Sequence, residues 1–238
     1  MVLREDRIWK QFFSPQMSSF FESYYSARGV RFVKTATVTE LRGDGAVSSA
    51  VLGDGQTISC EMVVAGIGVR PLTELLANSG IAVDDGVVVN EYLVTSYPDI
   101  FAAGDVANYF DVLFQKRRRV EHWDNAVSQG QYCAKALMGE RAPFRHVPYF
   151  FSDVFDLSYE FWGDPAGAEQ IVHRGDLPGG SFSVWWLRGN VVEAAFAMNR
   201  PDEEREVAPK WIEAGQRVSA ARLADASSSI GAAADSRA

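Results

Sequence analysis

A Gly–Asp pair after an apolar run is the first place in this sequence where side chains could do chemistry. Ile100-Phe-Ala-Ala103 predicts a short buried strand, and Gly104 and Asp105 follow it directly. Ligands of open α/β sheets bind at the carboxyl ends of strands, where Asp105 would lie. Glycine lets the backbone approach a ligand closely, and a carboxylate accepts hydrogen bonds from sugar-type hydroxyls. A Gly–Asp pair alone is more often an ordinary turn, so both interpretations stay open.

A second polar group stands where a helix is predicted to begin. Glu121, His122 and Trp123 open a segment with helical spacing that runs through Leu137 and stops near Gly139. The amino end of a helix favours anionic and other acceptor groups. His122 could titrate near neutral pH, although a lone histidine at a helix start is more often a structural residue.

A glycine-rich connection forms the third candidate. Gly66-Ile-Gly-Val-Arg-Pro71 follows Glu61-Met-Val-Val-Ala65, which predicts a buried strand. The glycines could form only a tight connection, or they could bring the backbone at Gly68 against a ligand. The pattern alone does not decide between the two.

The elements that must position these groups alternate along the first half of the chain. Ser14-Pro15 caps a helix that ends at Gly29, and its aromatic stripe predicts core packing. Val30-Arg-Phe-Val33 predicts a strand. Residues 37–59 alternate between Asp–Gly turns, which predicts an antiparallel meander. A short helix is predicted over 72–78.

The second half predicts an antiparallel sheet. The aromatic segment 147–163 predicts a core strand pair, and three further strands are predicted over 170–174, 181–188 and 191–198. Trp185 and Trp186 face opposite sides of their strand, so we expect one of them to be exposed or at an interface. A helix follows from Pro201 through Ile212. From Ser219 the sequence carries little apolar mass, which predicts a mobile tail.

Composition limits the class of protein. The 238 residues are 47% hydrophobic and 23% charged, which is typical of soluble globular chains. The net charge of −8 argues against a nucleic-acid or anionic-membrane binder. The one basic run, Lys116-Arg-Arg-Arg119, is more simply a solvated loop than a phosphate or partner-docking patch. Cys60 and Cys133 lack the spacing of a disulfide framework or a zinc site, and we expect two buried thiols and no metal. Without a membrane span or signal peptide, we expect a cytoplasmic protein.

The segment around Asp105 resembles a known flavoprotein motif. Thr95-Ser-Tyr-Pro-Asp-Ile-Phe-Ala-Ala-Gly-Asp-Val-Ala107 is similar to the second flavin-binding motif of two-dinucleotide-domain reductases. The resemblance implies that Asp105 contacts the ribityl chain of FAD, with Gly104 and Val106 beside it. The Gly66–Pro71 segment resembles the pattern that closes the NAD(P)-binding domain of these enzymes. Gly68 would accordingly lie near the nicotinamide. Residues 80–90 resemble the next segment of the family, which implies a short strand-turn-strand that returns the chain to the flavin domain.

Two later segments carry the same resemblance. Glu121-His-Trp-Asp-Asn-Ala126 is similar to a segment of ferredoxin-reductase-like and apoptosis-inducing-factor-like flavoproteins. There the glutamate and its neighbours meet nicotinamide and the isoalloxazine ring, which implies these roles for Glu121, His122 and Trp123. Pro148-Tyr-Phe-Phe-Ser-Asp153 resembles the start of the C-terminal interface domain, with Phe151 where tryptophan is frequent. Phe151 keeps a ring face for stacking near the flavin but lacks the indole N–H. The run from Phe155 to Asp164 resembles monodehydroascorbate-reductase-like members.

The resemblance implies a fold that is α/β plus α+β. It would be a partial two-dinucleotide-binding-domain flavoprotein with an antiparallel-sheet C-terminal interface domain. We expect residues 1–78 to form the C-terminal part of the NAD(P)-binding domain and 79–142 that of the FAD-binding domain. Residues 143–216 would form the interface domain and 217–238 a flexible tail.

Both GxGxxG turns of a complete reductase are absent from the sequence. We therefore expect the C-terminal half of an FAD-dependent NAD(P)H oxidoreductase, inactive alone, whose complete form binds FAD and NAD(P)H and reduces a ferredoxin- or rubredoxin-type iron–sulfur protein or a small-molecule acceptor. An engineered start, a truncated gene and a natural short homologue remain open explanations. No side chain is expected to be a catalytic acid or base. The alternative is a non-catalytic interaction or dimerisation module, derived from the reductase fold, that uses its aromatic C-terminal sheet to pair with itself or with another chain. The missing N-terminal half is a further possible partner.

Overall fold

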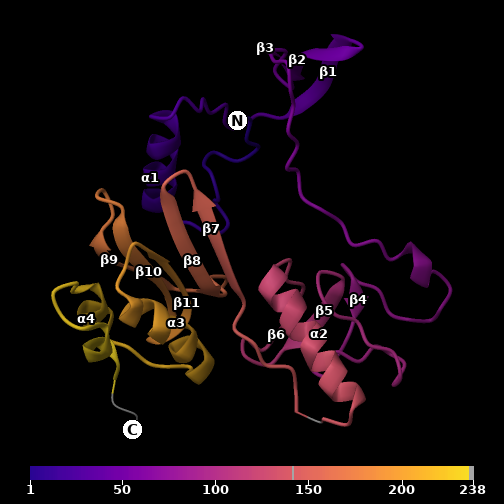
Figure 1. Ribbon diagram of the computed structural model, residues 1–238, viewed down its shortest axis with the longest axis vertical. Helices are drawn as coiled ribbons and strands as arrows, with labels where there is room; N and C mark the ends of the chain where they lie inside the picture. Colours follow the sequence, from indigo (N-terminus) through magenta and orange to yellow (C-terminus); the bar gives the residue numbers. More distant parts are fainter. Residues whose placement is uncertain (141, 236–238) are drawn as a thin grey trace. The chain divides into compact units, whose positions relative to one another are not determined.

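The computed structural model describes residues 1–140 and 142–235. The chain divides into two compact units, Met1–Gly68 and Val69–Ala238, hereafter the first and second units. Figure 1 traces both units from the indigo amino terminus to the yellow carboxyl terminus. Each unit is described by itself below.

The first unit begins with the predicted aromatic helix. Helix α1 (Pro15–Ser26) has Ser14 as its N-cap, whose hydroxyl accepts a hydrogen bond from the Met17 N–H at 3.3 Å. Phe21 is buried, and its ring stacks on that of Phe13 with centroids 5.3 Å apart. The helix and its core-facing aromatic stripe are therefore confirmed.

The predicted meander follows in the same unit. Strands β1 (Val38–Asp44), β2 (Ala46–Leu52) and β3 (Thr57–Ser59) form an antiparallel sheet in the order β1-β2-β3. Gly45 and Gly55 adopt φ values of +72° and +87° in the connecting turns, which is the conformation that favours glycine.

Two strands predicted in this unit do not form. Val33 makes only an isolated bridge with Val2, and residues 61–67 are extended, exposed and without a strand partner among the described residues. Met62, Val64 and Ile67 have exposed fractions of 77%, 88% and 93%. A run that is apolar on both faces is typical of a central parallel strand, which needs neighbours on both edges and layers on both faces. The described part of the chain supplies neither.

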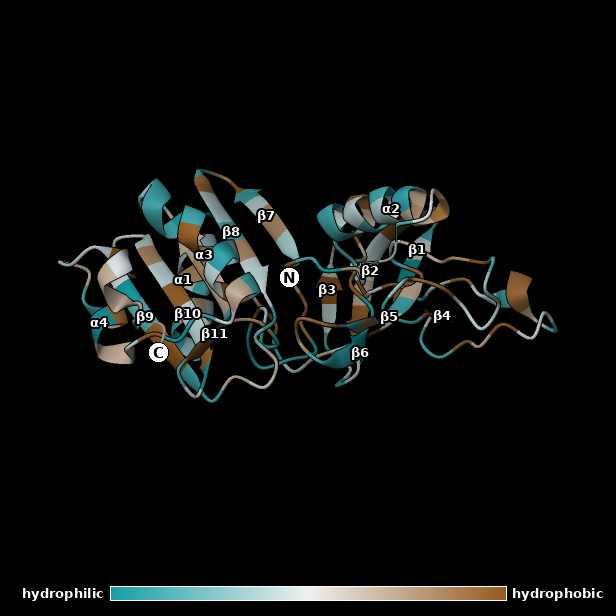
Figure 2. Ribbon diagram, turned by 90° about the horizontal axis from the view of Figure 1, so that it is seen from below, coloured by the Kyte–Doolittle hydropathy of each residue, from teal (hydrophilic) through white to brown (hydrophobic). Residues whose placement is uncertain are grey.

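The second unit opens with short elements. The helix predicted over 72–78 is a single 3₁₀ turn, η1 (Glu74–Leu76), and the predicted strand-turn-strand contains a bridge between Val83 and Val87. Strands β4 (Val87–Val88), β5 (Ala107–Asp111) and β6 (Lys116–Arg118) form a sheet in the order β4-β5-β6. Helix α2 (Trp123–Leu137) lies where it was predicted, with hydrophilic and hydrophobic bands alternating along it (Figure 2).

The predicted buried strand over residues 100–103 is wrong. Phe101 makes one isolated bridge with Val94, and Ile100 is 42% exposed. The apolar run resembles a sheet interior, but Val94 is its one strand partner among the described residues. The segment is nonetheless held in place, because the Thr95 N–H donates to the Ile100 carbonyl at 2.9 Å and the Ala102 N–H to the Leu93 carbonyl at 3.2 Å.

A five-stranded antiparallel sheet completes the second unit, as predicted. Its order is β7-β8-β11-β10-β9, and its strands are β7 (Tyr149–Val154), β8 (Leu157–Gly163), β9 (Gln170–Asp176), β10 (Ser181–Arg188) and β11 (Val191–Met198). Helix α3 (Asp202–Ala214) packs on β11 and β8. The prediction that Trp185 or Trp186 would be exposed or at an interface is wrong, because both side chains are buried. Trp185 packs against Trp211 of α3, and Trp186 packs against Phe161 of β8.

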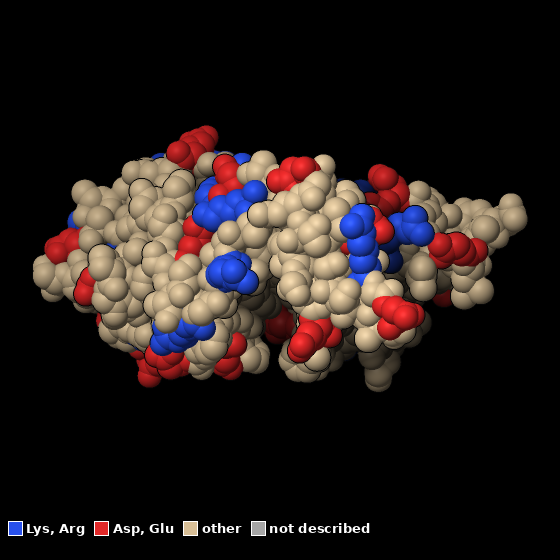
Figure 3. All heavy atoms as spheres, turned by 90° about the horizontal axis from the view of Figure 1, so that it is seen from above, with Lys and Arg blue, Asp and Glu red and all other residues tan. Residues whose placement is uncertain are grey.

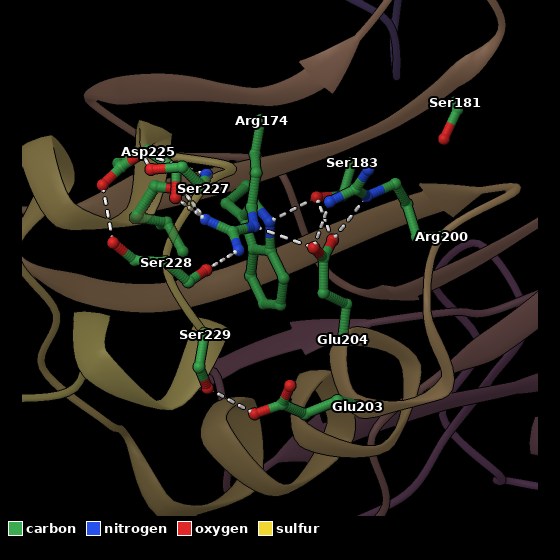
Figure 4. A network of polar contacts seen from close by, with 12 residues as sticks. Arg174, Ser181, Ser183, Arg200, Glu203, Glu204, Asp225, Ser227, Ser228 and Ser229 are labelled. Atoms are coloured by element: carbon green, nitrogen blue, oxygen red, sulfur yellow. Dashed lines mark hydrogen bonds and ion pairs between the residues drawn. The ribbon is translucent and has the colours of Figure 1, made fainter.

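The flexible tail expected over 217–238 is wrong for residues 217–235, and its last three positions lie outside the described residues. The segment folds into helix α4 (Ala220–Ala224) and a 3₁₀ turn η2 (Ile230–Ala233), with Leu223 and Ile230 buried. The Arg174 guanidinium donates to the backbone carbonyls of Leu223, Asp225 and Ser228, and its Nε donates to Glu204 at 2.8 Å (Figure 4). A few apolar side chains and one buried arginine therefore order a segment whose average composition predicts disorder.

The basic run is not a solvated loop. Lys116 Nζ and Arg118 Nη1 each lie 2.5 Å from the Asp164 Oδ2 atom, and the Arg118 side chain is only 12% exposed. Arg117 donates to the carbonyls of Val89 and Asn108. On the face drawn in Figure 3, lysine and arginine side chains lie beside acidic ones. The run is therefore structural, and the sequence did not reveal this because Asp164, which both Lys116 and Arg118 contact, is distant along the chain.

The structure also bears on the predictions about membrane spans and cysteines. Within the described residues, no helix has the length and apolar character needed to cross a bilayer. Cys60 and Cys133 are free thiols; Cys133 is buried as predicted, but Cys60 is partly exposed.

Candidate functional site

The Gly104–Asp105 pair forms a tight turn against helix α2. Gly104 has φ +79°, and the Ala107 N–H donates to the Gly104 carbonyl at 2.9 Å, which closes the turn. The Gly104 N–H donates to the side-chain oxygen of Gln129 at 2.7 Å, and Gln129 is fully buried in α2. The Asp105 side chain is exposed at the tip of the turn. The turn is therefore rigid while its carboxylate remains accessible.

The loop before β4 supports this turn from the other side. The Val87 N–H donates to the Val106 carbonyl at 2.7 Å. Gly86 has φ +111°, and a Cβ on it would lie 2.4 Å from that same carbonyl oxygen. Only glycine fits at position 86, between the loop and the turn. The hydrogen bond from the Val87 N–H fixes the backbone position of Val106, one of the predicted site residues.

The amino end of α2 presents uncapped backbone donors. His122 is the N-cap residue and makes no side-chain cap, while the Ala126 N–H begins the helical hydrogen bonds by donating to the His122 carbonyl. The N–H groups of the first turn and the helix dipole favour an acceptor or an anion at this end. Trp123 is 80% exposed there, and Glu121 is also exposed.

His122 is a neutral, partly buried imidazole. Burial, with a further contribution from the Arg118 guanidinium, lowers the pKa of His122 below its ordinary value of 6.5. Its ring meets Phe150 of β7 edge-to-face at a centroid distance of 5.0 Å. Its Nδ1 is buried and has no hydrogen-bond partner among the described residues. The histidine therefore joins α2 to the C-terminal sheet and retains an unused polar atom.

Arg119 connects the two predicted site segments. Its Nη1 donates to the Asp105 carbonyl at 3.1 Å and to a Glu121 carboxylate oxygen at 2.5 Å. Its Nη2 lies 3.3 Å from an Asp85 carboxylate oxygen. Sequence reasoning missed Arg119, Gln129 and Gly86 as site residues. The Lys–Arg run was the only signal, and it was interpreted as solvated.

A serine, a histidine and an aspartate also lie together behind α2, but they do not form a nucleophilic triad. His146 Nε2 lies 2.5 Å from Asp124 and 3.5 Å from the Ser128 hydroxyl. A triad needs the serine and the carboxylate on opposite ring nitrogens, whereas both groups here meet the same nitrogen. The arrangement ties α2 to the segment before β7 and offers no hydrolytic chemistry.

The structure brings seven of the eight predicted site residues into one unit. Six of them lie in the Gly104 turn or at the start of α2. Phe151 lies on β7 and is 62% exposed, but its ring lies beside that of Tyr149, on the opposite face of the strand from Phe150, which meets His122. Gly68 ends the first unit, has φ +88° and nothing packed against it, so its role stays a prediction. No group of three metal-ligating side chains occurs among the residues described.

These residues fit one end of an FAD molecule. An accessible carboxylate on a rigid turn suits a polyhydroxylated chain, and the uncapped helix end suits the carbonyl edge of a flavin ring. The buried Nδ1 of His122 is an unused polar atom at the same place. A glycine-rich turn that would hold the pyrophosphate is absent from the sequence.

Two models of known protein families match successive parts of the chain. Residues 1–130 match the family model described as pyridine nucleotide-disulphide oxidoreductase. Residues 149–234 match the model described as reductase C-terminal, which includes the ordered α4 and η2 segment.

Individual relatives point the same way. The chain is 34% identical over 215 residues to monodehydroascorbate reductase 4, peroxisomal, of Arabidopsis thaliana, covering 88% of this chain and 44% of that protein. A ferredoxin reductase from Rhodopseudomonas palustris superposes with a TM-score of 0.92 at 32% identity, covering 98% of this chain and 58% of the other. A covalent putidaredoxin reductase–putidaredoxin complex matches with a TM-score of 0.91 at 30% identity, covering 97% and 56%. The chain spans about half the length of the curated relatives it matches.

Proposed function

Because the chain belongs to the pyridine nucleotide-disulphide oxidoreductase family, we propose that it is the C-terminal half of an FAD-dependent NAD(P)H oxidoreductase. The family and its ferredoxin reductase neighbours imply FAD and NAD(P)H use in the complete protein. The observation that carries the proposal is the fixed turn of Asp105 beside the uncapped start of α2.

Each residue of the site then has a physical role. The Asp105 carboxylate accepts hydrogen bonds from the ribityl hydroxyls, and the Gly104–Val106 backbone keeps it in place. The first-turn N–H groups of α2 donate to the carbonyl edge of the flavin ring. Trp123 offers an exposed aromatic face for stacking at the start of α2. Glu121 faces the nicotinamide side.

The bound FAD supplies the redox chemistry, by accepting a hydride from NAD(P)H and releasing electrons singly. The residues of this chain orient and tune it. The neutral His122 adds no charge beside the ring, because burial keeps its pKa low. No side chain at the site is required as a general acid or base.

The chain alone binds a flavin only weakly under this proposal, because no residue segment supplies the pyrophosphate site, while the residues for the ring and the ribityl chain are present. The exposed segment 61–67 supports the same conclusion, since an apolar extended run of this kind belongs inside a parallel sheet. A polypeptide segment with the two GxGxxG units would complete both features.

The electron acceptor is a ferredoxin- or rubredoxin-type iron–sulfur protein or a small molecule. The putidaredoxin complex among the structural neighbours supports the first, and the monodehydroascorbate reductases support the second. We place the protein in the cytoplasm, although several relatives carry peroxisomal names.

A visible absorption spectrum of the purified chain tests the proposal. After incubation with FAD and removal of the unbound flavin, the chain alone should be nearly colourless, and with FAD and NADH present it should reduce ferricyanide slowly. Mixed with a polypeptide that carries both GxGxxG units, it should retain flavin and reduce the acceptor rapidly. Tight flavin binding and rapid acceptor reduction by the chain alone would contradict the half-protein proposal, and a colourless mixture would contradict flavin binding.

The exposed apolar residues favour one alternative, a non-catalytic interaction module. Leu137 and Met138 at the end of α2 are 70% and 90% exposed. Under this alternative the chain would associate with itself or another protein and never bind flavin. Sedimentation of the purified chain, together with the spectrum, distinguishes the reductase half from the interaction module. A stable, colourless dimer that does not bind the complementary polypeptide supports the module.

A further inference from the structure

Arg119 lies where three separate chain segments meet. It follows β6 directly and precedes the N-cap of α2, and its side chain is only 12% exposed. One guanidinium reaches Asp85 in the loop before β4, the Asp105 carbonyl in the turn, and Glu121 before the helix. The geometry points to Arg119 as the positioning residue that fixes Glu121 relative to the Gly104–Asp105 turn.

The structure provides space for this side chain. A Cβ on Gly86 would lie 3.0 Å from the Arg119 Cδ, so the absence of a side chain at Gly86 opens the path of the arginine. Both Gly86 and Arg119 therefore serve one arrangement, in which the loop before β4 supports the turn and the guanidinium spans it. A surface arginine in a chance ion pair needs no such path.

The chemistry of the contacts requires a guanidinium. The Nη1 atom serves two acceptors at 2.5 and 3.1 Å, and Nη2 serves a third at 3.3 Å. The planar fork of arginine can hold these acceptors in fixed directions, whereas the single ammonium of lysine cannot reach all three. Charge-assisted hydrogen bonds of this kind are also the stronger ones.

The inference rests on the proposed flavin site and deepens it. If Asp105 holds the ribityl chain and Glu121 faces the nicotinamide, their relative position sets where the ring lies between them. Arg119 touches neither ligand in this account and acts through Asp105 and Glu121. Gln129 holds the same turn at its Gly104 N–H, so the Gly104 amide and the Asp105 carbonyl are both anchored.

Amide chemical shifts with FMN as the probe test this assignment. FMN carries the ring and the ribityl chain and needs no pyrophosphate site, so it suits the chain as it is. The variants are Arg119→Met, Arg119→Lys and the matched control Arg117→Met. Arg117 belongs to the same basic run but donates to the carbonyls of Val89 and Asn108, and neither residue is part of the 104–107 turn or of the segment 121–123.

We expect FMN to shift the amides of 104–106 and 121–123 together in the wild-type chain. Arg119→Met should weaken FMN binding at least about tenfold, and the amides of 104–106 and 121–123 should no longer shift together as FMN is added. Arg117→Met should change the affinity less than about twofold. Arg119→Lys should recover part of the loss. In a cycle with Glu121→Gln, the two losses should not add, because Arg119 acts through that carboxylate.

The outcomes separate the two proposals. If the wild-type chain gives no FMN-dependent shifts at 104–106 or 121–123, the flavin site is wrong and the role of Arg119 falls with it. If the wild-type chain responds and Arg119→Met binds FMN like Arg117→Met, the positioning role alone is wrong. Thermal unfolding of each variant, measured alongside, shows whether a loss of affinity merely follows a loss of fold.

Discussion

Arg174 offers the clearest single test of what holds the C-terminal part of the second unit together. Arg174 and Glu204 are both about 3% exposed and lie 2.8 Å apart, and Arg200 and Ser183 also donate to Glu204 (Figure 4). Arg174→Met removes one partner of this buried pair and takes the guanidinium donor away from the carbonyls of Leu223, Asp225 and Ser228, of which the Asp225 carbonyl still accepts from the Ser228 N–H at 3.3 Å.

The expected cost of Arg174→Met is about 3 kcal/mol in free energy of unfolding, at the lower end of the range for breaking a buried pair. The lower end applies because Arg200 still neutralises Glu204. Arg205→Met is the matched control: Arg205 follows Glu204 on α3 and pairs with Glu160 and Asp202, but it is 45% exposed. Exposed pairs contribute at most about 1 kcal/mol.

Urea unfolding at pH 7, followed by tryptophan fluorescence, measures both changes, since Trp185 and Trp211 pack together in this core. Limited proteolysis should cut residues 219–235 sooner in Arg174→Met than in the wild type. Equal unfolding free energies for Arg174→Met and Arg205→Met would refute the role of Arg174 in holding residues 219–235 on the second unit.

The same site gives a pH dependence. Burial alone would raise the pKa of Glu204, but hydrogen bonds from Arg200, Ser183 and Arg174 outweigh it, and the pKa is lowered from its ordinary 4.5. The folded state therefore binds this proton less readily than the unfolded state. The contribution of Glu204 to stability is complete above about pH 4.5 and is lost as the pH falls through the lowered pKa.

Two further predictions concern the candidate site. Gly86→Ala should destabilise the second unit by about 2 kcal/mol or more in urea unfolding, because of the positive φ and the Val106 carbonyl; Gly130→Ala, in open space on α2, should instead stabilise by about 0.5–1 kcal/mol. An equal effect of the two changes would show that the turn is not supported there. The His122 ring, followed by NMR, should titrate below 6.5, and its contribution should reduce stability as the pH falls below 6.5, since the unfolded chain takes up that proton first. A midpoint above 6.5 would contradict its burial.

Local patterns predicted those elements whose partners lie nearby in the sequence. The meander, α2 and the strands of the C-terminal sheet were found from alternation, helix signals and turns, because hairpin neighbours carry their own pairing information. The runs 61–65 and 100–103 were mistaken for strands because apolar sequence predicts burial, while a strand also needs edges to pair with.

Long-range partners account for the other errors. Arg174 orders the tail through residues about 50 positions away, and Asp164 lies 46 residues from Arg118, so neither contact has a local signature. The candidate site itself was found through motifs around Asp105 and Glu121. The residues that join those motifs, Arg119 and Gln129, were visible only when the turn and the helix were seen together.

The central claim is that the Asp105 turn and the start of α2 together receive the ribityl and ring end of a flavin. An amide chemical-shift titration of the wild-type chain with FMN tests it most directly, with Asp105→Ala as the paired variant. We predict shifts confined to 104–106, 121–123 and the neighbouring strand β7, and their loss or marked weakening in Asp105→Ala. Shifts elsewhere, or an unchanged response without the Asp105 carboxylate, would contradict the claim.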